Sequence, residues 1–463
     1  MAVWAHINET SNGSHGGIML KEHRELLASG ESSYAFWGRG RNAADETECR
    51  FSTDAEVYLD VALTRLDDRA GFHSKAATRR LLAKLDDIKP SVVRLHNLHG
   101  YYVNVEMLFG WLAAHEDVRV EWTLHDCWAF TGHCSHFTMV KCEQWRTHCS
   151  YSKKCPQLRE YPKTIGAGAC CRNFEDKRRV FTSVPPERMR LVAPSQWLAD
   201  LVADSFFGGY PVEVRRNVVD TSVFKPTPSD FRVRYGIGDR FMVLGVASPW
   251  TKRKGLADFV RLAGELDDRF AIVLVGLSRR QIRKVPRQIV ALPRTESPED
   301  LAAMYTAADL HVQPSAEETY GMTVAEAIAC GTPVAVRAGS ACVEAAEGGD
   351  VHVMAADFSD LRGTVIRCGG GCLVVMFERT ANRKQLAAIY SAADLLLNPT
   401  HEDNYPTVNL EAEACGTPVF TRDVGGCRET VRMRESRLVV LREGRMLLAE
   451  AHPVGCERAS DDE

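Results

Sequence analysis

The chain has 463 residues, more than one compact hydrophobic core usually holds, so we expect two or three domains. Apolar residues make up 45% of the sequence and charged residues 25%, which is typical of a globular protein. The formal net charge of -4 gives no electrostatic basis for nucleic acid as a main partner, and no apolar run reaches the roughly 18 residues of a membrane-spanning helix. The N-terminus "MAVWAHINETSNG" lacks the basic and long apolar regions of a signal peptide, so we expect a cytoplasmic protein.

The first half of the sequence alternates short apolar strands with amphipathic helices. Strands are expected at "AVWAHI", "SSYAFWG", "SVVRLHN" and "VRVEWTLHD", and helices at "IMLKEHRELLASG", "TRRLLAKLDD" and "NVEMLFGWLAAH". Repeated strand–helix units predict a parallel sheet that is covered on both faces. We assign residues 1–190 to this Rossmann-like domain, which carries a cysteine-rich insertion at 127–171.

A second alternating run starts at "FMVLGVA" and continues through "FAIVLVG", "DLHVQPS" and "TPVAVR". Before it, Ser195 is placed to cap the N-terminus of a helix. We assign residues 191–368 to this second domain. The predicted fold class is therefore α/β, with two doubly wound Rossmann-like domains facing a cleft, and ligands bind in such a cleft at the carboxyl ends of the strands.

One stretch of the sequence occurs twice. Residues 294–334 align without gaps to residues 379–419, at a constant offset of 85, as one pair of glutamates shows (411 − 326 = 85). We interpret this as a tandem duplication, so that residues 369–463 form a partial duplicate with an extra β-α-β-α-β unit and a C-terminal tail. The partly unpaired sheet edge of such a unit favours self-association. The tail segment "LREGRMLLAEA" is expected to form a helix.

The first copy contains "EETYGMTVAEA", in which Glu318 and Glu326 are eight residues apart. Gly321 is expected in a turn, with a helix starting near Met322. The first-turn N–H groups, at Met322 and Thr323, then form an anion site, and glycine lets a phosphate approach the backbone closely. Glu326 can accept hydrogen bonds from ribose hydroxyls and Glu318 from a sugar. The alternative is a capped surface helix with solvated carboxylates.

Several motifs together resemble the retaining glycosyltransferases of family four, which have the GT-B fold. They are "EETYGMTVAEAIACGTPVAV", "EDNYPTVNLEAEACGTPVFTRDVGG" and "VASPWTKRKGLADF". The segment "TLHDCWAFTGHCSHF", with "CEQW" and "CPQLREYPKT" after it, is similar to the subgroup that builds capsules and exopolysaccharides. The resemblance covers about residues 1–350 and 373–430.

The resemblance implies transfer of a sugar from a nucleotide-sugar to a hydroxyl of a glycan or lipid-linked acceptor, with retention of configuration and no cofactor required for catalysis. By position, Arg253 and Lys254 neutralise the diphosphate as it leaves, where fixed cations gain most in the transition state. His125 contacts the donor sugar or orients the reacting hydroxyl. Asp126 fixes the tautomer of that histidine or holds an acceptor hydroxyl. The alternatives are a solvated basic turn and a capped strand end.

Two further segments are expected near the site. In "GSHGG", the small residues Gly16 and Gly17 let backbone N–H groups reach the donor diphosphate or the acceptor. In "LHNLHG", His96 and His99 are expected to line the acceptor side or to be structural, rather than to bind metal.

Four cysteines lie close together in the insertion: Cys134, Cys142, Cys149 and Cys155. Four soft ligands so close in sequence could hold a structural zinc ion, although the spacing is not that of two C-x2-C pairs. The alternative reading is a set of buried thiols.

Three questions stay open on the sequence alone: which copy carries the site, which function the chain has, and whether it contacts a membrane. The first copy follows the basic loop "KRKG" and is expected to carry the site; in the second, Pro406 replaces Gly321 and removes one N–H. The alternative function is a catalytically degenerate protein that binds a nucleotide-sugar and serves as a scaffold; a nucleotide-sugar epimerase is a remote third reading.

The basic amphipathic stretches "KAATRRLLAKL" and "EDKRRVF" suggest peripheral contact at the inner face of the membrane or, as the alternative, solvated faces.

Overall fold

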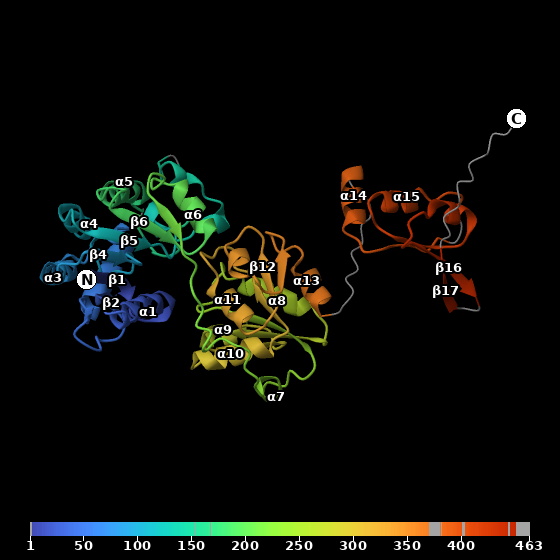
Figure 1. Ribbon diagram of the computed structural model, residues 1–463, viewed down its shortest axis with the longest axis horizontal. Helices are drawn as coiled ribbons and strands as arrows, with labels where there is room; N and C mark the ends of the chain where they lie inside the picture. The colour runs from blue at the N-terminus through green and yellow to red at the C-terminus, as the bar shows by residue number, and fades with distance from the viewer. Residues whose placement is uncertain are drawn as a thin grey trace. The chain divides into compact units, whose positions relative to one another are not determined.

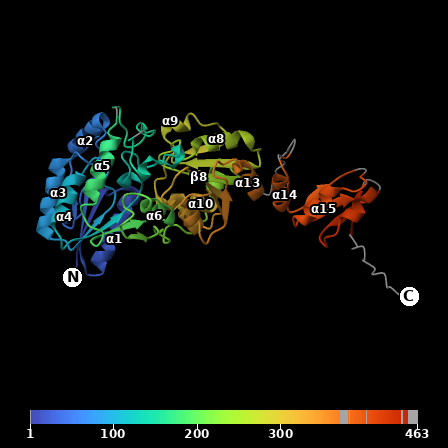
Figure 2. The same cartoon turned by 90° about the horizontal axis from the view of Figure 1, so that it is seen from above.

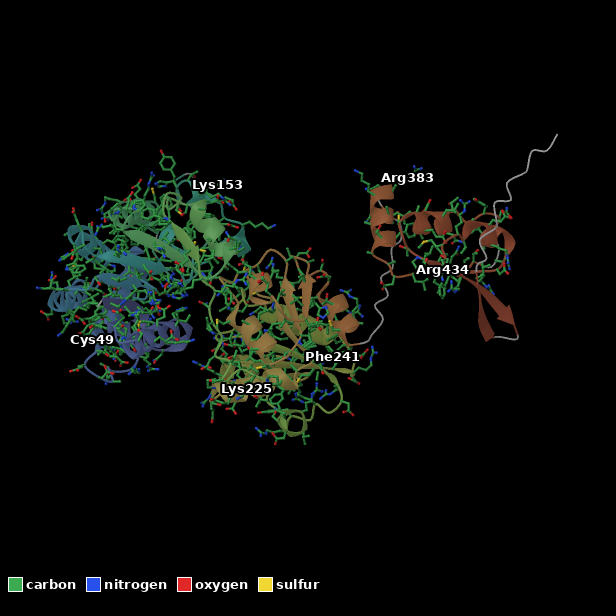
Figure 3. The ribbon with its side chains drawn as sticks, viewed as in Figure 1. Cys49, Lys153, Lys225, Phe241, Arg383 and Arg434 are labelled. Atoms are coloured by element: carbon green, nitrogen blue, oxygen red, sulfur yellow. The ribbon has the colours of Figure 1, made fainter. Side chains whose placement is uncertain are left out.

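The computed structural model describes residues 2–151, 153–166, 168–369, 380, 382–400, 403–442 and 445–450. The chain divides into two compact units, residues 1–373 and 374–463, each of which is considered by itself. Figure 1 colours the first unit from blue to orange and the second in red, and Figure 3 adds the side chains, with Lys225 and Phe241 in the first unit and Arg383 and Arg434 in the second.

The described part of the first unit begins with a parallel sheet in the order β3-β2-β1-β4-β5-β6-β7. Its strands are β1 (Val3–Thr10), β2 (Ser32–Arg39), β3 (Glu48–Arg50), β4 (Val92–Leu95), β5 (Arg119–Thr123), β6 (Met189–Ala193) and β7 (Val212–Val214). The central strands are buried because helices cover both faces, as a parallel sheet requires. The sheet runs past residue 190, where we had placed the domain boundary, because β6 and β7 complete its edge.

The helices of this domain follow the strand–helix alternation of the sequence. They are α1 (Gly13–Ala28), α2 (Asp54–Asp67), α3 (Lys75–Ile88), α4 (Val105–Ala114), α5 (Cys170–Phe181) and α6 (Gln196–Ala203). The helices α3, α4 and α5 pack side by side (Figure 2). Ser195 caps α6 as expected, since its side chain accepts a hydrogen bond from the Leu198 N–H. The helix α1 begins at Gly13, earlier than expected, so "GSHGG" forms its first turn rather than a loop.

The cysteine-rich insertion connects β5 to α5 and consists of loops with short 3₁₀ turns. These turns are η1 (Trp128–Phe130), η2 (Thr138–Val140) and η3 (Gln144–Arg146). Large aromatic side chains, among them Trp128 and Trp145, bury the insertion against the core of the first domain. Lys177 of α5 is buried beneath it and donates hydrogen bonds to the Trp128 and Thr131 carbonyls, at 2.8 and 3.0 Å. Burial lowers the pKa of Lys177 to about 7.

The second domain contains a parallel sheet in the order β10-β9-β8-β11-β12-β13 within the described residues. Its strands are β8 (Phe241–Val246), β9 (Phe270–Val275), β10 (Ile289–Leu292), β11 (Leu310–Gln313), β12 (Val334–Arg337) and β13 (Val351–Met354). Its helices are α7 (Phe231–Arg234), α8 (Leu256–Glu265), α9 (Arg279–Ile282), α10 (Pro298–Ala307), α11 (Met322–Ala329), α12 (Cys342–Ala345) and α13 (Leu361–Cys368). The strand order reverses between β8 and β11, which is the kind of switch point at which doubly wound sheets bind ligands.

The second unit repeats part of this domain in three dimensions. Its elements are α14 (Arg383–Ser391), β14 (Leu396–Asn398), α15 (Thr407–Ala414), β15 (Val419–Arg422), η4 (Gly425–Thr430), β16 (Arg437–Arg442) and β17 (Arg445–Glu450). The bounds of α15 and β15 equal those of α11 and β12 plus 85 (322 + 85 = 407; 334 + 85 = 419). The strand register repeats as well, because His311 pairs with Val334 and Leu396 pairs with Val419.

Two expectations for the second unit have different outcomes. Pro406 is the N-cap residue of α15, as Gly321 is of α11, so this helix start lacks the N–H that glycine supplies. The helix expected at "LREGRMLLAEA" is wrong, because its described residues belong to β16 and β17, which pair antiparallel.

Candidate functional site

A cavity of about 470 Å³ lies between the two domains of the first unit. Every residue that the sequence predicts for catalysis or donor binding lines it: His125, Asp126, Arg253, Lys254, Glu318, Gly321, Met322, Thr323 and Glu326. A cavity of about 1060 Å³ adjoins it and shares Met322, Thr323 and Glu326. A third, of about 600 Å³, shares Asp126 and Arg253 on the opposite side. The three form a continuous cleft with room for an extended ligand.

The basic loop between β8 and α8 supplies the cations of the cleft. Lys254 forms an ion pair with Glu318, and the Arg253 side chain donates to the Glu317 carbonyl. The Ala316 N–H donates back to the Arg253 carbonyl at 2.9 Å, which ties the two loops together. Burial by itself would raise the pKa of Glu318, but Lys254 and Arg253 hold it below its usual value. The positive and negative groups of these two loops therefore contact one another at the cavity wall.

The helix α11 begins at the cavity wall, at the residue expected from the sequence. Its N-cap, Gly321, has φ +103°, a conformation that residues with side chains rarely adopt. The first N–H groups of a helix have no partner within it and carry the positive end of its dipole, so this end attracts an anion. The Thr323 hydroxyl accepts a hydrogen bond from the Gln313 amide at 2.7 Å, which fixes its position beside the helix start.

Glu326 lies one turn further along α11 and faces the same cavity. The Tyr305 hydroxyl donates a hydrogen bond to it at 3.1 Å. Burial raises the pKa of Glu326 to about 7, and this hydrogen bond offsets only part of the shift. The carboxylate is therefore poised to gain from the hydroxyl donors of a bound ligand.

His125 follows β5 and lies within a column of imidazole rings. It stacks on His15 with ring centroids 4.8 Å apart and on His96 at 5.5 Å. Its Nε2 lies 3.2 Å from Nδ1 of His96. Burial lowers the pKa of His125 well below its ordinary value, so the ring is neutral near pH 7 and offers one hydrogen-bond donor and one acceptor.

Asp126 forms a short ion pair with His99 rather than with His125. Its Oδ2 lies 2.6 Å from Nε2 of His99, and its Oδ1 accepts from the Trp128 N–H at 2.8 Å. Burial would raise the pKa of Asp126, but the charge of His99 holds it well below its usual range. Burial would likewise lower the pKa of His99, but Asp126 raises it. This arrangement leaves a charged pair at the wall of the third cavity, where the Tyr161 hydroxyl lies 2.9 Å from Nδ1 of His99.

The two glycines predicted near the site, Gly16 and Gly17, lie in α1 and have different surroundings. A Cβ on Gly16 would lie 2.4 Å from the Ser11 carbonyl carbon, so this glycine is needed where α1 approaches the end of β1. Gly17 has open space at its Cβ and lines the larger cavity. Of the two, only Gly17 therefore faces the cleft in the part of the chain that the structure describes.

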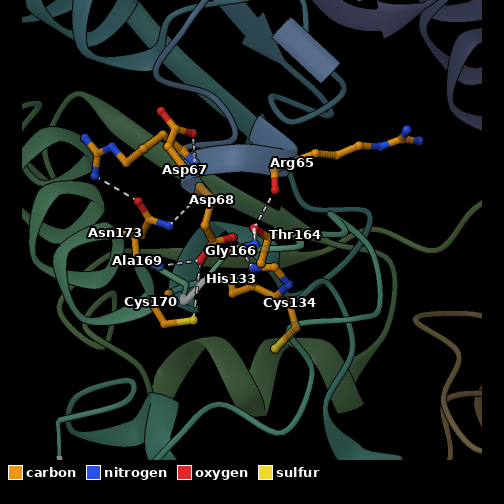
Figure 4. A network of polar contacts seen from close by, with 12 residues as sticks. Arg65, Asp67, Asp68, His133, Cys134, Thr164, Gly166, Ala169, Cys170 and Asn173 are labelled. Atoms are coloured by element: carbon orange, nitrogen blue, oxygen red, sulfur yellow. Dashed lines mark hydrogen bonds and ion pairs between the residues drawn. The ribbon is translucent and has the colours of Figure 1, made fainter. Parts of the chain in front are cut away.

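The four clustered cysteines pack within the insertion. Cys134 and Cys149 are buried, and Cys142 and Cys155 are half-buried. Among the described residues, no group of potential metal ligands combines these four; the groups that involve the insertion are Asp68, His133 and Cys170, and His148, Cys171 and Glu175. Figure 4 shows the first of these groups, in which Asp68 accepts from the Ala169 N–H at 2.7 Å and binds Nδ1 of His133.

Glu317 makes an interdomain contact that the sequence does not predict. Its side chain is 1% exposed and accepts hydrogen bonds from the N–H groups of Phe137 and Thr138, at 2.9 and 2.7 Å. It thereby joins the second domain to the cysteine-rich insertion of the first. The sequence motif assigns a role to the adjacent Glu318. Only the acidic pair "EE" could have indicated that Glu317 has a separate role.

Thr319, two residues further on, also crosses between the domains. Its hydroxyl donates to the His125 carbonyl at 3.0 Å, and its carbonyl accepts from the Ser195 hydroxyl at 2.7 Å. Glu344 strengthens the same interface, because it accepts from the first two N–H groups of α6. The loop that presents Glu318 and Gly321 therefore also holds the two domains together.

Replacing Gly321 by alanine should weaken anion binding at α11. The added Cβ would lie 2.8 Å from the Cys342 sulfur, and the positive φ adds strain of about 1–3 kcal/mol. We expect a weaker affinity for a nucleoside diphosphate, measured by isothermal titration calorimetry. Gly331→Ala is the matched control: it has φ +80° at the other end of α11, and its Cβ would meet only Pro226 at 3.8 Å. Equal affinities of both variants would exclude an anion site at Gly321.

Known proteins resemble both units of the chain. Residues 240–368 and residues 374–451 each match a family model described as "Glycosyl transferases group 1". A protein of Escherichia coli K12 named as the colanic acid biosynthesis glycosyl transferase WcaC is 27% identical over 221 residues, which is 45% of this chain and 52% of that protein. The alpha-galactosylglucosyldiacylglycerol synthase of Streptococcus pneumoniae is 32% identical over 179 residues, 35% of this chain and 46% of that protein. The chain thus spans about half the length of these curated relatives.

Solved structures share the fold. Sucrose-phosphate synthase from Thermosynechococcus elongatus aligns with a TM-score of 0.56 and 14% identity, covering 79% of this chain and 89% of that one. HepE from Anabaena, in complex with UDP and glucose, aligns with a TM-score of 0.51 and 15% identity, covering 80% and 90%. WaaG, a glycosyltransferase involved in lipopolysaccharide biosynthesis, aligns with a TM-score of 0.55 and 13% identity, covering 80% and 90%. The fold is GT-B, as the sequence predicts. In the described residues, no helix is long and apolar enough to cross a bilayer.

Proposed function

We propose that this chain is a glycosyltransferase that moves a sugar from a nucleotide-sugar donor to a hydroxyl of a glycan or lipid-linked acceptor, with retention of configuration, in polysaccharide synthesis. The observation that carries the proposal is the cavity that unites Lys254, the start of α11 and two acidic side chains with His125 opposite them. Matches of both units to glycosyl transferase models and the GT-B fold support it.

In this proposal, the donor lies across the cleft with its diphosphate between the basic loop and the start of α11. The bond between the anomeric carbon and the diphosphate oxygen breaks, and the acceptor oxygen bonds to that carbon. Negative charge grows on the leaving diphosphate, where Arg253, Lys254 and the α11 amides are already in place. The neutral His125 holds a sugar or acceptor hydroxyl, and the acceptor's proton departs with the leaving group.

The first copy is the one we propose to be functional, with the second unit as a partial tandem duplicate. The repeated elements at the offset of 85 support a duplication. A donor site needs the basic loop and the acidic helix on one sheet, and the first unit has both. Three predictions from the sequence stay predictions. They are buried thiols or a zinc site in the insertion, peripheral membrane contact, and self-association.

Donor affinity should depend on pH through Glu326. The ionised carboxylate accepts ribose hydroxyls, and burial raises its pKa to about 7. Affinity should therefore increase as the pH rises through about 7, by up to about tenfold per unit below that value. Titration calorimetry of a nucleoside diphosphate over this range measures how steeply the affinity changes with pH. Glu326→Gln should flatten this dependence, and an unchanged slope in that variant would assign the titration to another group.

A panel of nucleotide-sugars tests the proposal as a whole. The purified full chain is incubated with UDP-, ADP- and GDP-linked sugars, with and without a glycan acceptor, and the release of nucleoside diphosphate is measured. We expect slow hydrolysis of one donor, accelerated by acceptor. Tight binding of a donor that is never cleaved would favour the scaffold instead.

A further inference from the structure

Three potential metal ligands meet beneath the histidine column of the first domain. His6 lies in β1, Glu22 in α1, and His96 directly after β4, which pairs with β1. The Glu22 Oε2 atom is 3.9 Å from Nδ1 of His6 and 3.7 Å from Nε2 of His96. All three ligand atoms lie within 4.8 Å of one another.

The two histidines lack hydrogen-bond partners where they face this point. His6 is 0% exposed and His96 is 1% exposed. Neither ring nitrogen of His6 has a partner, nor does Nε2 of His96. Burial lowers the pKa of both rings well below the ordinary value, so both are neutral. Buried polar atoms in proteins are almost always satisfied, so the two unpartnered nitrogens that face Glu22, Nδ1 of His6 and Nε2 of His96, indicate a missing partner.

We propose that His6, Glu22 and His96 bind a divalent transition-metal ion, with zinc as the ion that this donor set favours. Two imidazoles and one carboxylate are the ligands of known open zinc sites. Zinc bonds of about 2.0–2.2 Å place tetrahedral ligand atoms roughly 3.3 Å apart. The two distances from Glu22, 3.9 and 3.7 Å, reach that value with shifts of a few tenths of an ångström, whereas the two imidazoles, whose ligand atoms lie within 4.8 Å, would have to rotate toward each other. A fourth position would be open to water.

The surrounding charges support the carboxylate as a ligand. Arg94 donates to Glu22 at 3.1 Å and also to Glu121 at 2.7 Å, so its charge is shared between two carboxylates. Metal-bound carboxylates are themselves usually hydrogen-bonded, which orients them. Arg215 adds a cation 3.8 Å from Glu121, and Glu213 balances it at 2.8 Å.

A metal ion at this site would also determine which nitrogen of the His125 ring carries the proton. An ion on Nε2 of His96 leaves the proton of that ring on Nδ1, which lies 3.2 Å from Nε2 of His125. His96 would then donate to His125, whose own proton would stay on Nδ1. In this way the site would fix the tautomer of the cleft histidine, a consequence that rests on the proposed function.

The test measures metal directly and needs no transferase assay. The full chain is stripped with a chelator, dialysed against Zn²⁺, and its metal content measured by elemental analysis. We expect His6→Ala and Glu22→Gln each to bind one zinc fewer per chain than the wild type. His23→Asn is the matched control, because His23 lies beside His6 but both its nitrogens have partners, Ser33 and Thr47.

Cobalt distinguishes this site from the cysteines of the insertion. Co²⁺ bound by nitrogen and oxygen gives visible d–d bands without the strong near-ultraviolet charge transfer of a thiolate site. We expect such bands in the wild type and in His23→Asn, and their loss in both ligand variants, with circular dichroism confirming the fold. Wild-type protein that binds no metal, or variants that keep the wild-type stoichiometry and spectrum, would overturn the proposal.

Discussion

Lys254→Ala should reduce turnover by about 10²–10³-fold, as expected when a preorganised charge that stabilises a leaving group is removed. Lys254 lines the central cavity and is held there by Glu318. Because the diphosphate gains charge only as the glycosidic bond breaks, the loss should fall mainly on kcat. Steady-state kinetics with the donor identified from the panel measures it. Lys254→Arg should restore part of the activity, because it keeps the charge but changes its geometry.

The control for this variant is Lys284→Ala, which removes an exposed lysine from the same domain. Lys254→Ala also leaves the half-buried Glu318 without the lysine of its ion pair, so we expect a lower melting temperature. Assays well below that temperature separate misfolding from lost chemistry. A folded Lys254→Ala protein with near wild-type kcat would show that the basic loop does not meet the leaving group.

Glu326→Ala should lower kcat/KM by at least about 100-fold, whereas Glu411→Ala should leave it unchanged. Hydrogen bonds to a charged acceptor contribute about 1.5–3 kcal/mol each, and Glu326 is placed to accept more than one from a ribose. Glu411 occupies the equivalent turn of α15 and lies near Tyr390, as Glu326 does near Tyr305. The two substitutions are therefore chemically matched. Kinetics of both variants at saturating acceptor decide between the copies.

An inactive Glu411→Ala protein with an active Glu326→Ala protein would reverse the assignment of the site to the first unit. Loss of activity in both would mean that the second unit contributes to the reaction. Donor titrations of each variant then separate a binding defect from a chemical one, because nucleotide affinity is measured without turnover.

Local sequence signals predicted several strands of the second domain and the start of α11. Gly321 marks the turn, and α11 begins at the next residue, Met322, as expected. The cavity gathers the predicted donor residues because the basic loop and α11 both follow strands at the switch point of one parallel sheet. Such positions follow from strand order, and strand order follows from the alternation that the sequence displays.

The errors arose where tertiary contacts overrule local pattern. The glycines of "GSHGG" suggested a loop, but α1 uses Gly16 to approach Ser11, a contact that no periodicity reveals. The helix expected at the C-terminal tail is a pair of strands because β16 and β17 pair with one another. Glu317 was missed because its partners, two N–H groups of the insertion, are about 180 residues away in the sequence.

If the chain acts as proposed, the loop that contains Glu317, Glu318, Thr319 and Gly321 links the release of a product to the separation of the two domains. It contacts the first domain through two of these residues and faces the cavity with the other two. Separation of the domains to release a product must therefore detach this loop from His125 and Ser195 while it still borders the occupied cavity. Occupancy and interdomain closure then form one cooperative equilibrium, and each ligand that tightens the loop slows its own departure.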